Sequence, residues 1–273
     1  MRGRVLVGLA LALAVAFVIA PSSLAGGTYG RSGFDNGPLV DVTRTSLVAF
    51  WKAGAGDFSP SLQSTVDYWV RYHVAKALIA AALSVVLIVL GARVWRALVR
   101  AEGRGRRAAL TSAGAGVTML ALFAMSVVMA NVQGAIAPFS SLLSLLGPEQ
   151  RGGELAVTID QIRQMLAQSA GMPGGQRSLA LDTIVGDFSR YHAALAVMAA
   201  VGTTALAVVT ATSWRAGSSP TRSSAPSRGL LRASSVSSGA LALLMLLVTV
   251  ANVSNATAPE QGLLLFFGPA ISP

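Results

Sequence analysis

Residues 74–94 read VAKALIAAALSVVLIVLGARV, an apolar run that carries charge only at Lys76 and Arg93, close to its two ends. A helix needs about 20 apolar residues to cross the roughly 30 Å of hydrocarbon in a bilayer, so this run predicts a membrane-spanning segment. Three further runs have similar length, at about residues 109–130, 193–213 and 236–251. Since every backbone N–H and C=O must be paired inside a segment surrounded by lipid, each run is expected to be an α-helix.

The composition of the whole chain also indicates a membrane protein. Its 273 residues are 53% hydrophobic and 12% charged, with a mean hydropathy of +0.62, whereas a soluble domain carries about 25% charged residues. There is no cysteine, which excludes disulfides, thiolate nucleophiles and cysteine-ligated metals. The net charge of +10 is concentrated in short loops beside the apolar runs, so it indicates membrane topology and not nucleic-acid binding.

The first apolar run, residues 5–20, has the pattern of a signal peptide. Arg2 and Arg4 form a positively charged start, and Pro21 is expected to break the helix. Ser23 and Ala25 are small residues at the positions that a signal peptidase reads. We therefore predict a signal peptide over residues 1–25, cleaved after Ala25. The alternative is an uncleaved anchor helix with the same orientation.

Arginine residues determine the predicted orientation. The loop at about residues 93–107 holds six arginines and one acidic residue, and the loop at about residues 214–232 holds four arginines and no acidic residue. Segments 26–72 and 138–191 have nearly balanced charge. The positive-inside rule places both basic loops in the cytoplasm. Residues 26–72, residues 138–191 and the C-terminus are then extracytoplasmic, in a multi-pass protein of the cell membrane.

The two pairs of spans resemble each other, which indicates an internal repeat. An arginine–tyrosine–histidine triplet precedes each inward span and an asparagine ends each outward span; these residues are Arg71, Tyr72, His73 and Asn131, and Arg190, Tyr191, His192 and Asn252. We predict repeat units at residues 26–148 and 149–273 that face the same way, as a parallel repeat. The expected fold is all-α, a four-helix membrane bundle made of two duplicated hairpins.

Each repeat also carries an amphipathic segment outside the apolar runs. Leu155, Ile159, Ile162 and Leu166 fall on one face of a helix. Asp41 is expected to cap the corresponding helix of the first repeat. Glycine-rich breaks follow at residues 54–60 and 171–175. We expect these outer helices to pack on the extracytoplasmic end of the bundle.

The eight repeated polar residues form the candidate site, a polar cluster at the outer end of the bundle. His73 and His192 are the only histidines in the chain. Three interpretations are open: a polar packing cluster, a pair of axial haem ligands that joins two helices, or a site for another ligand. Asn131 and Asn252 are expected either to hydrogen-bond a neighbouring tyrosine or histidine, or to cap their own helices. We predict no catalytic residue, metal site or cofactor.

The interior of the spans narrows the choice of function. No ionisable residue occurs in residues 79–92, 112–130, 193–211 or 236–251, whereas ion-coupled transporters and proton relays need charge near the midplane of the membrane. The leading hypothesis is a non-enzymatic scaffold or accessory subunit in the lipid bilayer, whose outer helices engage another membrane or extracytoplasmic protein. The alternatives are a transporter or channel for a small solute or lipid, and a bis-histidine haem electron carrier.

A resemblance to a group of proteins rests on composition alone. The chain is rich in alanine, valine, glycine and arginine, and in this it resembles uncharacterised multi-spanning membrane proteins of actinobacteria. The resemblance implies a bacterial membrane protein and implies no particular activity.

Overall fold

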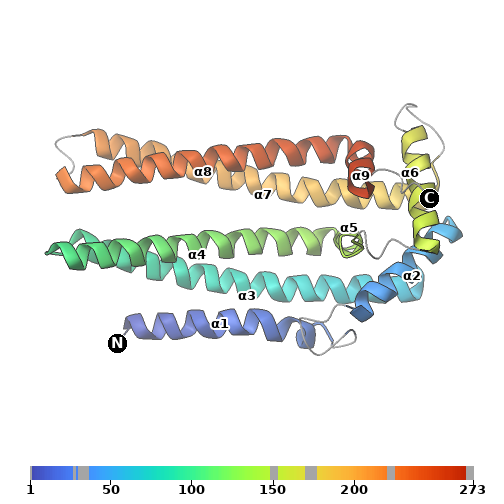
Figure 1. Cartoon of the computed structure of the whole chain (residues 1–273), viewed down its shortest axis with the longest axis horizontal. Coiled ribbons are helices and arrows are strands. Elements are labelled where there is room, and N and C mark those ends of the chain that lie inside the picture. The colour runs from blue at the N-terminus through green and yellow to red at the C-terminus, as the bar shows by residue number, and fades with distance from the viewer. Residues whose placement is uncertain are drawn as a thin grey trace. The chain divides into compact units, whose positions relative to one another are not determined.

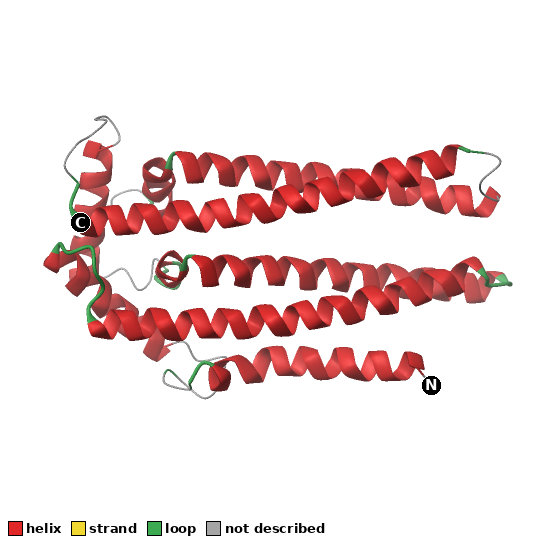
Figure 2. Cartoon of the chain, turned by 180° about the vertical axis from the view of Figure 1, so that it is seen from behind, coloured by secondary structure: helices red, strands yellow, loops and turns green. Residues whose placement is uncertain are grey.

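A computed structural model describes residues 2–26, 29, 37–147, 153–169, 177–219 and 225–268. These residues form α-helices joined by turns and contain no β-strand (Figure 1, Figure 2). Five of the described helices are long and apolar enough to cross a membrane. The all-α prediction and the prediction of membrane-spanning helices are therefore confirmed, and the five helices fit a multi-pass membrane protein.

The chain divides into two compact units. The first unit comprises Met1–Tyr191 and Ala258–Pro273, and the second comprises His192–Thr257. Helix α7 (Leu179–Ser218) begins in the first unit and continues into the second, which also holds most of α8 (Ala225–Thr257). In the second unit the Thr210 and Ser238 hydroxyls of α7 and α8 lie 2.8 Å apart, within hydrogen-bonding distance.

Three long helices of the first unit lie side by side: α1 (Arg2–Leu24), α3 (Pro60–Val99) and α4 (Arg104–Ile136) (Figure 1). Helix α3 begins where the Ser59 hydroxyl accepts a hydrogen bond from the Leu62 N–H at 3.3 Å, with Pro60 in the first turn, as is typical of helix starts. The turn between α3 and α4 contains Gly103 at φ +84°, a backbone conformation that favours glycine. Helix α3 thus runs antiparallel to its two neighbours.

The prediction that Pro21 breaks the first helix is wrong. Helix α1 continues through Pro21 to Leu24, and the Pro21 carbonyl accepts a hydrogen bond from the Ala25 N–H at 2.9 Å. A proline inside a helix removes one backbone hydrogen bond. Packing against the rest of the first unit offsets that loss, since Ser22 is 3% exposed and Ala25 is fully buried.

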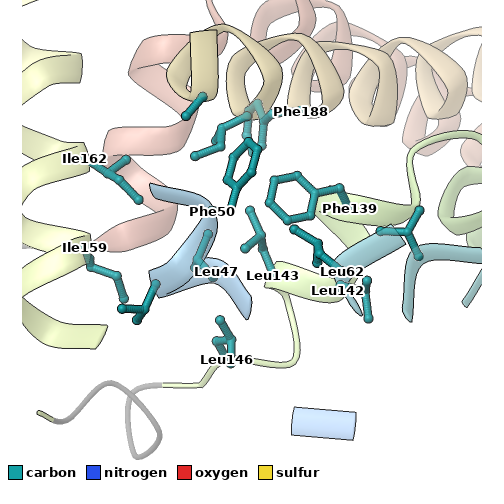
Figure 3. Packing of buried hydrophobic residues seen from close by; sticks show 14 of the residues in the cluster. Leu47, Phe50, Leu62, Phe139, Leu142, Leu143, Leu146, Ile159, Ile162 and Phe188 are labelled. Atoms are coloured by element: carbon teal, nitrogen blue, oxygen red, sulfur yellow. The ribbon is translucent and has the colours of Figure 1, made fainter. Parts of the chain in front are cut away.

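A helical cap covers one end of α3 and α4. We define the cap as α2 (Gly37–Ala53), α5 (Pro138–Leu143), α6 (Glu154–Ser169), α9 (Pro259–Phe267) and the first turns of α3 and α7. All of these parts contribute to one hydrophobic core. Figure 3 displays the packing of Leu47, Phe50, Leu62, Phe139, Leu142, Leu143, Leu146, Ile159, Ile162 and Phe188. An ion pair of 2.7 Å between Arg177 and Glu260 also ties α9 to the residues before α7.

The structure tests two expectations about the outer helices. The four residues assigned to one face of α6, Leu155, Ile159, Ile162 and Leu166, are buried in the cap core, so that prediction is confirmed. The prediction that Asp41 caps a helix is wrong, because α2 begins earlier, at Gly37. Pro38 suits a helix start, and Leu39 is buried in the cap core. Packing of Leu39 therefore lets the helix begin on the N-terminal side of Asp41. The glycine-rich break at residues 171–175 lies outside the described residues.

Candidate functional site

His73 lies on α3 where the cap meets the long helices. Its ring packs edge-on against Trp69, with ring centroids 4.6 Å apart. Trp69 in turn stacks flat on Tyr72, with centroids 5.1 Å apart and an interplanar angle of 4°. Trp69 precedes His73 by four residues, and side chains at that spacing meet on one face of a helix. The histidine is therefore held in a rigid aromatic group.

Both ring nitrogens of His73 have hydrogen-bond partners. Nδ1 lies 3.0 Å from the Asn131 Oδ1 of α4, and Nε2 lies 3.2 Å from the Ser141 hydroxyl of α5. Asn131 also donates from Nδ2 to the Val127 carbonyl at 2.7 Å. The Trp69 indole N–H donates to the Ser141 hydroxyl at 3.0 Å. Three helical segments, α3, α4 and α5, are thus joined through one imidazole.

The partners determine which His73 nitrogen carries the proton. The Asn131 NH₂ donates to the Val127 carbonyl, which fixes the orientation of the amide with Oδ1 towards His73. An amide oxygen accepts only, so His73 Nδ1 is the donor. Because Ser141 accepts from Trp69, its own O–H is left to donate to Nε2. Donors and acceptors then match along the whole chain of bonds with a neutral imidazole. A fully paired polar network of this kind specifies one packing of its helices.

Gly134 makes room for the His73 ring. A Cβ atom added to Gly134 would lie 2.7 Å from both Cε1 and Nε2 of that ring. Carbon and nitrogen atoms do not approach so closely without a bond between them, so only glycine allows α4 to pass at this distance. The close packing of α4 against the His73 ring therefore requires both the histidine and the glycine.

The second unit contains a similar histidine–asparagine pair. His192 Nδ1 of α7 lies 2.7 Å from Asn252 Oδ1 of α8, and Asn252 donates from Nδ2 to the Val248 carbonyl at 2.8 Å. In both units the asparagine lies inside its helix, since α4 ends at Ile136 and α8 at Thr257. The alternative in which these asparagines cap their helices is therefore wrong, and each pairs with the neighbouring histidine.

The two arginines of the predicted polar cluster, Arg71 and Arg190, have partners other than the histidines. Arg71 donates from Nε to the Ala25 carbonyl at 3.1 Å, at the end of α1. Arg190 forms an ion pair of 3.1 Å with Asp187, one turn earlier on α7. The Tyr191 backbone carbonyl accepts a hydrogen bond from the Gln133 side chain of α4 at 3.1 Å. The Arg71 and Gln133 contacts join different helices, whereas the Arg190–Asp187 ion pair lies within α7.

Sequence reasoning missed Asp187, a buried carboxylate in the cap. It is 4% exposed, and its Oδ2 accepts a hydrogen bond from the Ser140 N–H at 2.7 Å. Ser140 lies in the first turn of α5, where unpaired N–H groups and the helix dipole favour a negative charge. The sequence feature that could have indicated it is an aspartate next to the apolar helix face of Leu181, Ile184 and Phe188. Ser141, Trp69 and Gly134 carried no comparable signal, because their roles depend on contacts between helices.

The contacts that the structure gives for the two histidines are hydrogen bonds and ring contacts within the protein. Among the described residues, no group of three or more histidine and acidic side chains is placed to hold a metal ion. The chain was also compared with known proteins, and no family model, curated protein or solved structure matches it. The assignment of function therefore rests on the geometry. That the two histidine sets lie close together remains a prediction, since they belong to different units.

Replacing either histidine tests this interpretation. His73→Ala and His192→Ala are each expected to lower the free energy of unfolding in detergent by about 1 kcal/mol, because each strands an asparagine oxygen. Thermal unfolding of the two purified variants measures the effect, with Gln164→Ala on the exposed side of α6 as the control. Loss of a bound chromophore at unchanged stability would contradict the packing role.

Proposed function

We propose that the protein is a non-enzymatic scaffold or accessory subunit of the cell membrane, with the helical cap as its extracytoplasmic interaction surface. The observation that carries this proposal is the paired state of His73, whose two ring nitrogens are occupied by Asn131 and Ser141. Catalytic or ligand-binding imidazoles need a nitrogen directed at the reacting group or ligand. A histidine used to join three helical segments fits a structural role.

The charge at the ends of the first unit supports the proposed orientation. Arg4 at the start of α1 and the arginines of the loop at residues 93–107 lie at the end opposite the cap (Figure 1). The positive-inside rule assigns that end to the cytoplasm and the cap to the outside. The arginines of the loop at residues 214–232 belong to the cytoplasm by the same rule.

The element lengths support the proposed duplication and four-helix bundle. Helices α3 and α7 each have 40 residues, and α4 and α8 each have 33. The histidine–asparagine pairs join the equivalent helices in each hairpin. We propose that the two hairpins are parallel repeats that associate as one four-helix bundle.

We also propose that α1 is retained as an anchor helix and is not removed as a signal peptide. The residue before the expected cleavage site, Ala25, is fully buried in the cap core. Its carbonyl accepts the Arg71 hydrogen bond at 3.1 Å. Phe17 of α1 also lies under the ammonium group of Lys76, 4.6 Å from the ring centroid. Cleavage after Ala25 would remove these contacts.

The orientation is tested with topology reporters. A reporter fused within residues 100–107 or 218–228 is expected to read cytoplasmic, and one after Gly268 is expected to read external, because of the arginine asymmetry. Paired alkaline-phosphatase and fluorescent-protein fusions give opposite signals on the two sides of the membrane. An external signal from either basic loop would reject the proposed topology.

The interaction surface is tested by co-purification. The outer face of α6 carries Val157, Gln164 and Gln168, all exposed. If this face binds a partner protein, Gln164→Arg is expected to reduce the co-purified partner about tenfold, because an interface would bury an unpaired charge. Quantitative mass spectrometry of protein extracted from native membranes measures the change, with Glu102→Gln in the basic loop as the control. An unchanged partner profile in both variants would remove this face from the proposal.

A further inference from the structure

An apolar groove runs between the three long helices of the first unit. It has a volume of about 470 Å³ and is lined by α1, α3 and α4. Val7 and Phe17 lie near its two ends on α1, and all of its lining side chains are apolar. A volume of about 300–1,000 Å³ is the range in which proteins hold small-molecule ligands. Water is a poor occupant, because a buried water needs two to four polar partners.

The length of the groove matches one leaflet of a bilayer. Phe17 lies ten positions after Val7 on the helix, which corresponds to about 15 Å at 1.5 Å per residue. The hydrocarbon of a bilayer is about 30 Å thick, so its half-thickness is about 15 Å. A lipid acyl chain therefore fits the groove in both polarity and length.

A cationic side chain lies at the cap end of the groove. The Lys76 ammonium is 4.6 Å from the centroid of the Phe17 ring, and Lys76 precedes the groove residue Ala80 by one helical turn. Lys76 donates a hydrogen bond to the Tyr72 hydroxyl at 3.4 Å. In the part of the chain that the structure describes, the ion pairs involve other basic residues. A phosphate group would give the Lys76 ammonium a negatively charged hydrogen-bond partner.

We propose that the groove between α1, α3 and α4 is a binding site for an anionic phospholipid. One acyl chain lies in the groove, and the phosphate lies against the Lys76 ammonium at the membrane surface. The site is separate from the proposed scaffold role, since it requires no partner protein. It does require α1, so the mass of the intact purified protein must include residues of α1.

The test compares two lipids that differ in charge. Delipidated full-length protein in maltoside detergent is mixed with phosphatidylglycerol or phosphatidylcholine of identical acyl chains, and bound lipid is counted by native mass spectrometry. The protein is expected to bind one phosphatidylglycerol with about tenfold preference, as a single charge-assisted contact provides. Lys76→Gln is expected to abolish the preference. Lys52→Gln should retain it, because Lys52 is exposed on the cap and paired with Glu154.

A second pair of variants tests the groove itself. Ala14 lines the groove and Ala12 does not, although both are exposed on α1. Ala14→Phe is expected to reduce binding of both lipids about tenfold by filling the groove, whereas Ala12→Phe should bind as the unmodified protein does. Equal binding by the two phenylalanine variants, a retained charge preference in Lys76→Gln, or a mature protein without α1 would each overturn the proposal. Because Lys76→Gln leaves the groove unchanged in shape, its result holds even if Ala14→Phe fails to fold.

Discussion

Phe139→Ala is expected to lower the free energy of unfolding in detergent by about 3–5 kcal/mol, the largest loss for any single substitution considered for this protein. Phe139 is 1% exposed. Its ring lies beside that of Phe50 (Figure 3). The ring centroid of Phe139 is 5.6 Å from that of Phe50 and 4.9 Å from that of Phe58. Removing the ring leaves a cavity in the centre of the cap, and the surrounding helices can close it only in part.

The same substitution is expected to disturb the His73 network. Helix α5 has only six residues, too few to be stable as an isolated helix. It is held by Phe139 and by the Asp187 hydrogen bond to Ser140, and it carries the Ser141 hydroxyl that contacts His73. Loss of Phe139 therefore loosens both the cap core and the polar cluster.

Met119→Ala is the control for this experiment. Met119 lies on α4, is 71% exposed and does not line the groove of the first unit, so its side chain faces lipid or detergent. Truncation of an exposed side chain costs within about 0.5 kcal/mol. Chemical or thermal unfolding of the two variants in the same detergent gives the comparison. Equal losses would mean that the cap core does not contribute to stability as its burial indicates.

Gly134→Ala is expected to lower the free energy of unfolding by about 1–3 kcal/mol, as overpacking does elsewhere. The new methyl group would lie 2.7 Å from the His73 ring. The ring cannot retreat without breaking its hydrogen bonds to Asn131 and Ser141. Other glycines of α4 have no such constraint: an added Cβ at Gly116 meets nothing within 4 Å.

The sign of the Gly134→Ala effect is expected to reverse when His73 is removed. In a His73→Ala background the methyl group has space, and alanine is more favourable than glycine in a helix by about 0.5–1 kcal/mol. Gly116→Ala should stabilise both backgrounds by a similar amount. A double-mutant cycle by thermal unfolding measures the coupling between the two positions. Equal effects of Gly134→Ala in both backgrounds would show that the His73 ring does not occupy this place.

Periodicity and composition were sufficient to predict the parts of this fold that depend on local patterns. The long apolar helices follow from run length, since a bilayer requires about 20 apolar residues per span. The buried face of α6 follows from the spacing of Leu155, Ile159, Ile162 and Leu166. Helix ends were less predictable, because Pro21 and Asp41 lie inside α1 and α2. At the C-terminal end of α1 and the N-terminal end of α2, packing of neighbouring residues extended the helix past the residue that was expected to end or begin it.

The repeated sequence marked His73, Asn131, His192 and Asn252 as candidate residues but did not determine their roles. That each asparagine pairs with a histidine depends on how α3 meets α4 and how α7 meets α8. The remaining members of the first cluster come from other parts of the chain, with Ser141 on α5 and Gly134 on α4. Their roles arise from distances between helices, which a one-dimensional pattern does not contain.

The sequence by itself therefore determined that the chain is helical, that it has apolar segments long enough to span a membrane, and that an arginine–tyrosine–histidine triplet occurs twice. These properties follow from lipid solvation, helical periodicity and residue identity, all of which can be read along the chain. Only the tertiary structure decided that α1 packs against α3, that Asp187 binds the start of α5, and that both nitrogens of His73 are occupied. Each of these depends on segments far apart in the sequence meeting within hydrogen-bonding or van der Waals distance, and burial makes such contacts obligatory for the polar groups involved.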